Sequence, residues 1–349
     1  MPGKLPDTFR LMFLLSGEHP TLPQAEIRGA IKAEGGSYEI LEELDQVLVL
    51  ETDLRPQRVA ERLSLSREVC QFLGISNSDE VLETLASSDL PDLLPAGKTF
   101  AVRVERIKGS CPEVERAKLE REVADLLLSE LDLRVDLEHP EIEIVGVLTN
   151  GKCCLGLKVA ETARRSLRSR RPSARAAFHP STLPPTMARC MVNLSRAPRG
   201  GVLCDPFCGV GGILVEAGLM GIKPIGIDID PQMVEGARKN LEFYGIRDFE
   251  VRVGDARELP EMEVDAVVTD PPFGIQSSTG GLGVEELVGA ALPQISKILK
   301  RKGLACLSTP DWLDIGKKAE EVGLSVLEVH EQYVHRGLTR RIYVLKKTG

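Results

Sequence analysis

From residue 200 onward, short apolar strands alternate with helices, and this alternation restricts the possible folds more than any other feature of the chain. The strand segments read GVLCDPF, KPIGIDI, FEVRVGD, VDAVVTD and GLACLST. We expect the helices between them to begin near Gly211, Pro231, Val284 and Leu313. Continuous apolar strands that alternate with helices are typical of a parallel sheet covered on both faces. LSVLEVHEQYV and TRRIYVLKK add a closing antiparallel hairpin, so the sequence predicts an α/β, doubly wound sheet of seven strands.

The N-terminal half mixes strands and helices in a less regular order, which predicts an α+β structure. FRLMFLLSG indicates a strand, TLPQAEIRGAIKAEGG a helix, YEILEELDQVLVLET one or two strands, and RPQRVAERLSLSREVCQFL a second helix. Further on, TFAVRVERI alternates like a half-buried strand, and ERAKLEREVADLLLSEL has the spacing of an amphipathic helix. IEIVGVLT and KCCLGLKVA follow as a hairpin around Asn150-Gly151, a strong turn signal. We therefore expect domains at 1–70 and 71–160, a basic linker at 161–184 and the α/β domain at 185–349.

Composition is typical of a soluble protein in a reducing compartment. No apolar run approaches the roughly 18 residues of a membrane helix, and LMFLL near the N-terminus is too short for a signal peptide. The eight cysteines include no CxxC pair, so we expect reduced, mostly buried thiols and no metal site. We accordingly expect a cytoplasmic protein without membrane contact.

The net charge of −8 argues, taken alone, against nucleic acid as a partner, but the charge is unevenly distributed. Between Lys158 and Arg175, seven basic residues are opposed by Glu161 alone, which gives +6 within 18 residues. Such a stretch either neutralises phosphates or is the solvated face of a linker, and both interpretations stay open. The arginines of this stretch are Arg164, Arg165, Arg168, Arg170, Arg171 and Arg175.

Acidic residues recur where the predicted strands of the α/β domain end, and ligands of open α/β sheets bind at that edge. The four residues are Asp205, Asp228, Asp255 and Asp270. Asp228 lies 19 residues after Gly209, the spacing at which an acid can accept hydrogen bonds from ribose hydroxyls. Asp230 before Pro231 predicts a helix N-cap instead. Asp255 is either an acceptor for an adenine amine, with the Ala256 amide as donor to the ring, or an ordinary turn residue.

The first strand end continues into DPFCGVGGI, which predicts a tight turn that lets the backbone approach a ligand at a helix N-terminus. Its glycines are Gly209, Gly211 and Gly212. The motif is not GxGxxG, since Leu214 stands three residues after Gly211, and this weakens a pyrophosphate-binding interpretation. The alternative is tight packing of helix on strand without a ligand. Together with Asp228 as the acceptor for ribose hydroxyls, the glycine loop favours a pocket for an adenosine that carries no pyrophosphate.

The fourth strand end reads TDPPFGI, and its two prolines predict a stiff, extended turn. That turn holds the Asp270 carboxylate, the Pro271 carbonyl and the Phe273 ring in register. Two acceptors aimed at the N–H groups of an exocyclic amine favour its pyramidal, nucleophilic form, and the ring can stack on a planar base. A strand terminator without chemistry is the alternative.

These motifs resemble those of class I S-adenosylmethionine-dependent methyltransferases over residues 200–349. Asp205 and the glycine loop are similar to the family's first motif, GIDID to its ribose motif, and DPPF to its motif for methylation of exocyclic amines. The N-terminal half resembles a ferredoxin-like domain followed by a THUMP domain. The whole chain resembles the tRNA (guanine(10)-N2)-methyltransferase family, including RAAFHPSTLPPTMARCMVNLS before the catalytic domain. This resemblance places Phe178, Thr182 and Ile229 beside the cofactor.

The resemblance implies an enzyme that methylates the N2 amine of a guanosine, at position 10 of tRNA, with S-adenosylmethionine as cofactor. It gives the basic linker a role in binding tRNA, and members of the family often work with a small zinc-binding activator subunit. A related guanine site in tRNA or rRNA, and a non-catalytic RNA-binding protein that keeps an adenosine pocket, are the alternatives. DNA is disfavoured, because the N-terminal half has no helix-turn-helix pattern. The sequence leaves open the nucleotide, the number of methyl groups and the oligomeric state.

Overall fold

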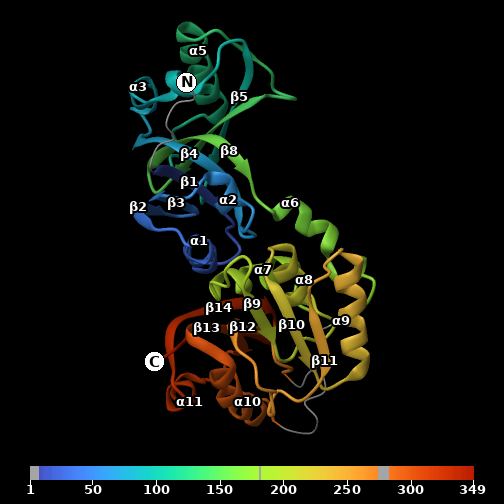
Figure 1. Cartoon of the computed structure of the whole chain (residues 1–349). Helices are drawn as coiled ribbons and strands as arrows, with labels where there is room; N and C mark the ends of the chain where they lie inside the picture. Colours follow the sequence, from blue (N-terminus) through green and yellow to red (C-terminus); the bar gives the residue numbers. More distant parts are fainter. Residues whose placement is uncertain (1–7, 181, 274–282) are drawn as a thin grey trace. The chain divides into compact units, whose positions relative to one another are not determined.

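The computed structural model describes residues 8–180, 182–273 and 283–349, and the chain divides into two compact units (Figure 1). The N-terminal unit takes the residues up to Gly17 together with Gly36–Glu61 and Ser66–Thr162. The C-terminal unit takes Glu18–Gly35, Arg62–Leu65 and Ala163–Gly349. Two short pieces of the N-terminal sequence therefore belong to the unit that the rest of the C-terminal half builds.

The N-terminal unit is built on one eight-stranded sheet of order β2-β3-β1-β4-β8-β7-β5-β6. Its strands are β1 (Phe9–Leu15), β2 (Tyr38–Leu44), β3 (Val47–Thr52), β4 (Ser66–Asn77), β5 (Lys98–Arg106), β6 (Leu133–Val135), β7 (Ile142–Thr149) and β8 (Lys152–Glu161). Its helices are α2 (Pro56–Ala60), α3 (Val81–Ala86), α4 (Leu90–Leu93) and α5 (Arg116–Glu130). Strand β4 joins the two parts of the sheet, because it pairs with β1 on one side and with β8 on the other.

Two local predictions in this unit are confirmed. Asn150 and Gly151 both have positive φ, 48° and 77°, as a two-residue hairpin turn requires, and Thr149 pairs with Lys152 across it. The amphipathic helix forms as α5 and buries one face on the sheet through Leu119, Val123 and Leu127.

The predicted second helix at 55–73 is wrong beyond its first turns. Helix α2 ends at Ala60, and the strand β4 begins at Ser66. Over so short a stretch, its apolar residues fit both the 3.6-residue period of a helix and the two-residue period of a strand. Gly74, directly after it, disfavours a helix. Pairing with neighbouring strands makes this segment a strand. Cys70 lies opposite Met12 of β1 on one side, and Ile75 lies opposite Cys154 of β8 on the other.

The C-terminal unit contains the predicted sheet of seven strands, in the order β11-β10-β9-β12-β13-β15-β14. The first five in that order run parallel, and β15 lies antiparallel between β13 and β14. The strands are β9 (Val202–Asp205), β10 (Lys223–Asp228), β11 (Glu250–Val253), β12 (Val264–Thr269), β13 (Leu299–Pro310), β14 (Leu324–His335) and β15 (Leu338–Lys347).

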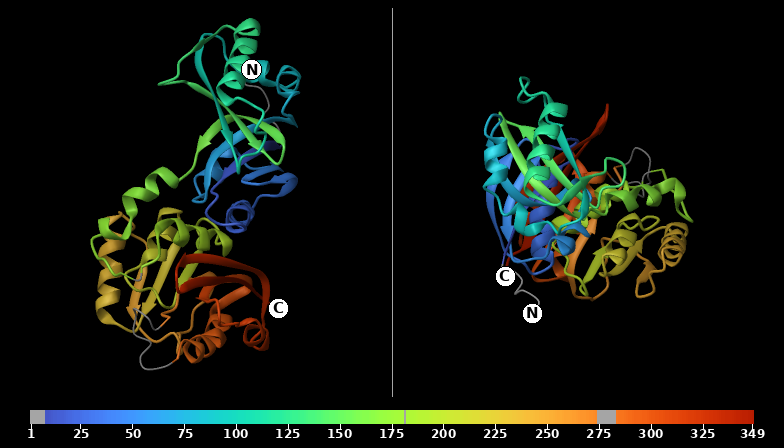
Figure 2. Two further views of the ribbon diagram at one scale, coloured as in Figure 1. Left: turned by 180° about the vertical axis from the view of Figure 1, so that it is seen from behind. Right: turned by 90° about the horizontal axis from the view of Figure 1, so that it is seen from above.

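Helices cover both faces of this sheet, as the alternation predicts (Figures 1 and 2). On one face lie α1 (Leu22–Ala33), α7 (Pro185–Leu194), α8 (Gly212–Leu219) and α9 (Pro231–Phe243). On the other face lie α10 (Val284–Ile298) and α11 (Gly316–Glu321). None of the described helices is long and apolar enough to cross a membrane. All eight cysteines are buried and unpaired, which confirms the expectation of buried thiols.

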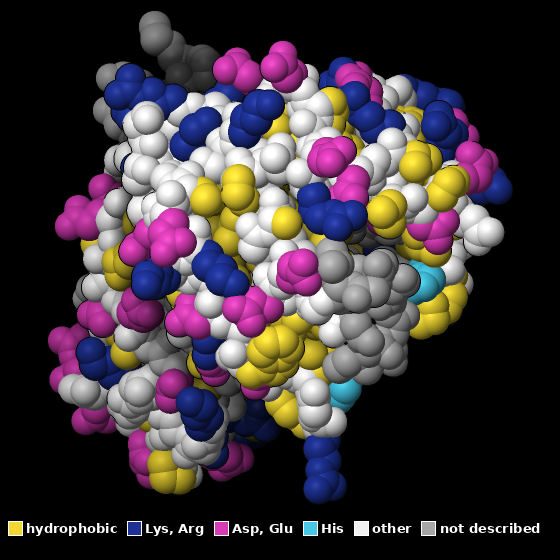
Figure 3. Space-filling view, turned by 90° about the horizontal axis from the view of Figure 1, so that it is seen from below, with side chains coloured by type: hydrophobic (Ala, Val, Ile, Leu, Met, Phe, Trp, Pro, Cys, Tyr) yellow, Lys and Arg dark blue, Asp and Glu magenta, His cyan; other side chains and the backbone are white. Residues whose placement is uncertain are grey.

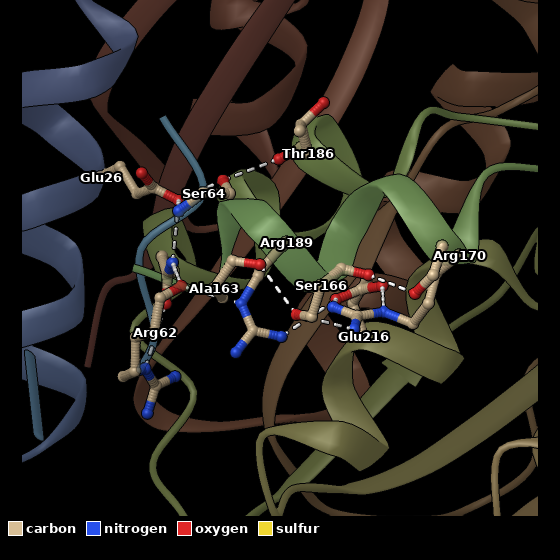
Figure 4. A network of polar contacts seen from close by, with 11 residues as sticks. Glu26, Arg62, Ser64, Ala163, Ser166, Arg170, Thr186, Arg189 and Glu216 are labelled. Carbon is tan, nitrogen blue, oxygen red and sulfur yellow. Dashed lines mark hydrogen bonds and ion pairs between the residues drawn. The ribbon is translucent and has the colours of Figure 1, made fainter. Parts of the chain in front are cut away.

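Helix α1 and residues 62–65 are held in the C-terminal unit by buried polar contacts with α7 (Figure 4). The fully buried Glu26 accepts hydrogen bonds from the amides of Ser64 and Leu65 and from Asn193, at 2.9, 2.8 and 3.1 Å. Arg62 donates to Asn193 at 3.0 Å. Because a buried carboxylate without donors is costly, these contacts are what allow Glu26 to lie at this position.

The basic segment that follows β8 is folded rather than extended. It forms α6 (Arg164–Leu167) and two 3₁₀ turns, η1 (Arg168–Arg170) and η2 (Pro172–Ala174), and all three belong to the C-terminal unit.

Candidate active site

The parallel strands β9, β10 and β12 end at the same edge of the C-terminal sheet (Figure 1). Asp205 and Asp228 are the last residues of β9 and β10, and Asp270 directly follows β12. A hollow of about 410 Å³, open to solvent, lies at this edge. Asp205 and Asp270 both line it, as do the glycine loop and part of the segment before α7. The lining residues are His179, Thr182, Leu183, Asp205, Phe207, Cys208, Gly209, Val210, Gly212, Ile213 and Asp270.

The glycine loop closes the hollow at the start of α8. Gly209 and Gly211 have φ of 49° and 79°, in the left-handed region that suits glycine. A side chain at Gly212 would lie 2.9 Å from Thr182 and 3.1 Å from an Arg175 nitrogen, so the segment before α7 can approach the helix only because no Cβ is present. The tight turn that the glycines predict is therefore present in the structure, and the approach of its backbone to a ligand stays a prediction.

Asp205 is the most deeply buried acid of the site, with 1% of its surface exposed. Its Oδ1 accepts hydrogen bonds from the Thr269 hydroxyl at 2.6 Å and from the Phe207 amide at 3.1 Å. The pKa of Asp205 is raised to about 7, chiefly by burial and in smaller part by the charges of Asp228 and Asp270, against the lowering effect of the two donors. A cationic group entering the hollow would favour the ionised form.

Asp228 is tied to the glycine loop. It accepts from the Gly209 amide at 2.8 Å and from the Asp230 amide at 3.0 Å, and burial raises its pKa above the ordinary value. Asp230 itself caps α9, since it accepts from the Gln232 amide at 2.7 Å, which confirms the predicted N-cap. Each Asp228 oxygen keeps a further lone pair that can accept from a hydroxyl.

Several predicted cofactor residues lie outside the lining of the hollow as this structure shapes it: Phe178, Gly211, Asp228, Ile229, Asp255 and Ala256. Asp255 is held by Arg257, whose Nε donates to it at 2.9 Å, and this contact lowers the pKa of Asp255. Ala256 is buried in the core. Phe178 and Ile229 have exposed fractions of 57% and 61%, so their apolar side chains are free to cover a ligand at this edge.

The DPPF motif, which the sequence predicts to be catalytic, begins directly after β12. The Asp270 carboxylate accepts a hydrogen bond from the Ser308 hydroxyl and pairs with Arg340, whose Nε and Nη2 lie 3.3 and 3.4 Å from its oxygens. The Arg340 guanidinium also lies over the Phe273 ring, 5.7 Å from its centre. Gly274 and Ile275 of the quoted motif lie outside the described residues.

Sequence reasoning missed Ser308 and Arg340. They stand 38 and 70 positions after Asp270, and no local motif marks them. The pairing of β12 with β13, and of β13 with β15, is what brings them to the aspartate.

The six arginines of the basic segment have different environments. Arg168 and Arg171 are exposed, and Arg164 pairs with Glu18 at 3.3 Å. Arg170 donates twice to Glu216, at 2.9 and 3.0 Å (Figure 4). Arg175 has an exposed fraction of only 7%. The Arg165 side chain lies outside the described part of the structure. The structure therefore does not present this run as one charged surface.

Figure 3 shows one face of the molecule, on which acidic and basic side chains are mixed with apolar ones. Among the residues described there, neither sign of charge forms a continuous patch. A phosphate contact would therefore depend on individual arginines, and the exposure and ion pairing of each one decide whether it is available.

Comparison with known proteins gives matches to both parts of the chain. Residues 172–342 match the RMKL-like methyltransferase domain family, and residues 76–158 match the THUMP domain family. The chain is 38% identical to the tRNA (guanine(10)-N2)-dimethyltransferase of Methanothermobacter thermautotrophicus, over 97% of this chain and 99% of that protein. The protein of the same name from Pyrococcus abyssi is 35% identical, over 94% and 96%. In fold, the chain is similar to the crystal structure of TrmN from Thermus thermophilus, with a TM-score of 0.56, 21% identity and coverage of 97% and 100%.

Proposed function

The chain belongs to the family of tRNA (guanine(10)-N2)-dimethyltransferases, and we propose on this premise that it methylates the exocyclic N2 amine of a guanosine in tRNA, using S-adenosylmethionine. The observation that carries the proposal is the position of Asp270 and Phe273. They follow β12 at the same sheet edge as the glycine loop, so a methyl donor and an amine can meet there. Guanosine 10 is the proposed target, after the names of the relatives.

The buried charges of the site fit the zwitterionic tail of the cofactor. S-adenosylmethionine, when bound, supplies an electrophilic methyl group on a positively charged sulfur. Asp205 provides a buried anion that suits the ammonium group of the tail, and Asp228 provides acceptors that suit the ribose hydroxyls.

Arg175 is the complementary cation. Its Nη1 and Nη2 are buried and have no hydrogen-bond partner of good geometry among the described residues, although Tyr244 and Glu216 lie near enough to raise its pKa against the effect of burial. Glu216 already accepts from Arg170 and from Arg189, at 2.9 and 3.0 Å. Three guanidinium groups around one carboxylate leave an excess of positive charge beside the first turn of α8, where an anion is favoured. We propose that Arg175 binds the carboxylate of the cofactor tail.

The DPPF motif activates the amine. The N2 lone pair of guanine is delocalised into the ring, so the amine is a weak nucleophile. Asp270 and the Pro271 carbonyl accept hydrogen bonds from the two N–H groups of the amine and favour a pyramidal nitrogen, while Phe273 stacks on the base. Alignment of the amine with the methyl group then lowers much of the barrier.

The N-terminal part of the chain supplies the proposed tRNA contact. We propose a ferredoxin-like domain at 1–70, a THUMP domain at 71–160, a basic segment at 161–184 and a catalytic domain at 185–349. Of the arginines, the exposed Arg168 and Arg171 are best placed to bind phosphates. A tRNA-modifying role also fits the cytoplasmic location expected from the sequence. A small zinc-binding activator subunit rests on the family resemblance alone, and co-purification with this chain would test it.

The proposal is tested by incubating unmodified tRNA with labelled S-adenosylmethionine, followed by nucleoside analysis and mapping of the modified position. We expect N2-methylguanosine or N2,N2-dimethylguanosine, and a loss of about a hundredfold or more in rate for Asp270→Ala, with binding of tRNA and cofactor retained. Asp248→Ala is the matched control, because this carboxylate is 80% exposed and remote from the motif. Full activity of Asp270→Ala, or label in another nucleoside, would contradict the proposal.

A further inference from the structure

Arg340 makes two contacts in the active site that the motif itself does not explain. Its guanidinium pairs with the Asp270 carboxylate, and the same group lies over the Phe273 ring. Only 9% of its surface is exposed, so it cannot be a solvated surface charge. Ser308, which has no exposed surface, donates to the same carboxylate from the neighbouring strand.

The sheet register explains why these two side chains converge. Ser308 lies opposite Ile342 and Pro310 opposite Arg340 in the β13–β15 pair. Residues two apart along a strand share a face, so Ser308 and Arg340 project from the same face of the sheet, at the edge where β12 ends. The next residue, Arg341, lies opposite Thr309 and projects from the other face, where it pairs with Glu331 at 3.6 Å.

We propose that Arg340, assisted by Ser308, is the positioning residue of the catalytic motif: it keeps Asp270 as an oriented carboxylate and holds Phe273 in place for the target base. This inference rests on the proposed methylation of an amine, since it concerns how that motif is kept in its working form. Asp270 accepts N–H groups only while it is ionised, because a protonated carboxyl would present a donor to the amine.

The surroundings of Asp270 make such a partner necessary. Asp205 and Asp228 lie at the same edge, at the ends of β9 and β10, and the Asp205 and Asp270 carboxylates repel each other when both are ionised. His179 lines the hollow from the segment before α7. Burial raises the pKa of Asp270 above its ordinary value, while Arg340 first and Ser308 second lower it. Arg340 is therefore the cation that counteracts burial at this carboxylate.

The contact with Phe273 adds a geometric role. A guanidinium over an aromatic ring is attracted by the negative charge of the ring face, and this attraction restricts the ring in a turn that two prolines already stiffen. Arginine suits both tasks, because its planar group can pair with a carboxylate at one edge and stack through its face.

The inference is tested by the pH profile of the single-turnover rate of methyl transfer between pH 5 and 9, for Arg340→Met, Arg340→Lys and Ser308→Ala. Without the cation, the apparent pKa of the acidic limb should rise by about one unit or more. Arg340→Met should therefore lose about tenfold in rate for each unit of that rise at pH values below the limb, and recover as pH rises above it. Arg340→Lys should restore most of the profile through its charge, and Ser308→Ala should shift the limb less.

Arg341→Met is the matched control, since the same substitution one residue away leaves Asp270 untouched. Binding of S-adenosylhomocysteine reports on the folded state of every variant. A loss of rate that is equal at all pH values, or a profile that does not move, would overturn the inference while leaving the proposed function standing. Failure of the wild-type protein to methylate guanosine would instead contradict the proposed function.

Discussion

At the scale of single residues, burial decides the role of a charge more than its place in a run of like charges. Arg168 and Arg175 belong to one basic stretch, yet the first is exposed and the second is buried beside the glycine loop. A guanidinium that is removed from water and lacks acceptors is costly unless an anionic ligand arrives. For Arg175 we propose the cofactor carboxylate as this ligand, and the proposal makes a measurable prediction.

Arg175→Met should weaken binding of S-adenosylhomocysteine by about tenfold or more, because a charge-assisted hydrogen bond is removed. Binding of 5′-methylthioadenosine, which has the same nucleoside but no amino-acid tail, should change little. Isothermal titration calorimetry measures both, with Arg168→Met as control, since that arginine is exposed in the same segment. Equal weakening of the two ligands would show that Arg175 shapes the pocket but does not bind the carboxylate.

At the scale of elements, helix α1 and residues 62–65 form part of the C-terminal unit although they precede β4 in the chain. Leu22, Ala25 and Leu65 share a core with Met187 and Leu203, so these pieces cover the same sheet face as α7. The polar contacts of Glu26 specify where they lie, since its donors come from residues 64–65 and from Asn193 of α7, and so join all three segments.

Glu26→Gln should lower the free energy of unfolding of the C-terminal unit by about 2 kcal/mol at pH 7. The amide has one acceptor oxygen in place of two, so a buried backbone N–H would face its NH₂ group. Denaturant unfolding with hydrogen-exchange measurements on residues 22–33, 62–65 and 185–194 would report the change. These three segments should lose protection together. Glu320→Gln, on an exposed part of α11, should leave all three unaffected.

At the scale of the whole molecule, an acidic protein has to hold a polyanionic substrate. The net charge is −8, so affinity for tRNA depends on where individual cations lie and not on the charge of the whole chain. Exposed arginines that make no ion pair are the best candidates, because their pairing with phosphate releases counterions without breaking an internal contact.

The double variant Arg168→Glu with Arg171→Glu should weaken tRNA binding and flatten its salt dependence, by about one unit of slope for each phosphate that the protein no longer neutralises. Cofactor affinity should not change. Arg301→Glu with Lys302→Glu carries the same change of net charge on exposed residues of β13 and separates a local effect from a general one. An unchanged slope in the first variant would mean that this segment only connects the two halves of the chain.

Much of the C-terminal unit could be predicted from the sequence because its signals are local. The strands and helices of the α/β part can each be recognised from a pattern of about ten residues. Asp205, Asp228 and Asp270 fall at strand ends that the topology brings to one edge. The Asn150-Gly151 turn is local in the same sense. The DPPF motif by itself indicates the chemistry, since its two acceptors and its ring are adjacent in the chain.

Tertiary structure alone decided what depends on pairing between distant segments. Residues 66–77 became a strand because β1 and β8 supply partners on both sides, a preference that the segment does not carry within itself. Arg170 and Arg175 became interior cations because Glu216 and Gly212 on α8 lie beside them. Arg340 and Ser308 reached Asp270 through the sheet register, which no motif in the sequence encodes. The sequence thus determined which reacting groups are present, and the fold determined which partners set their charge and orientation.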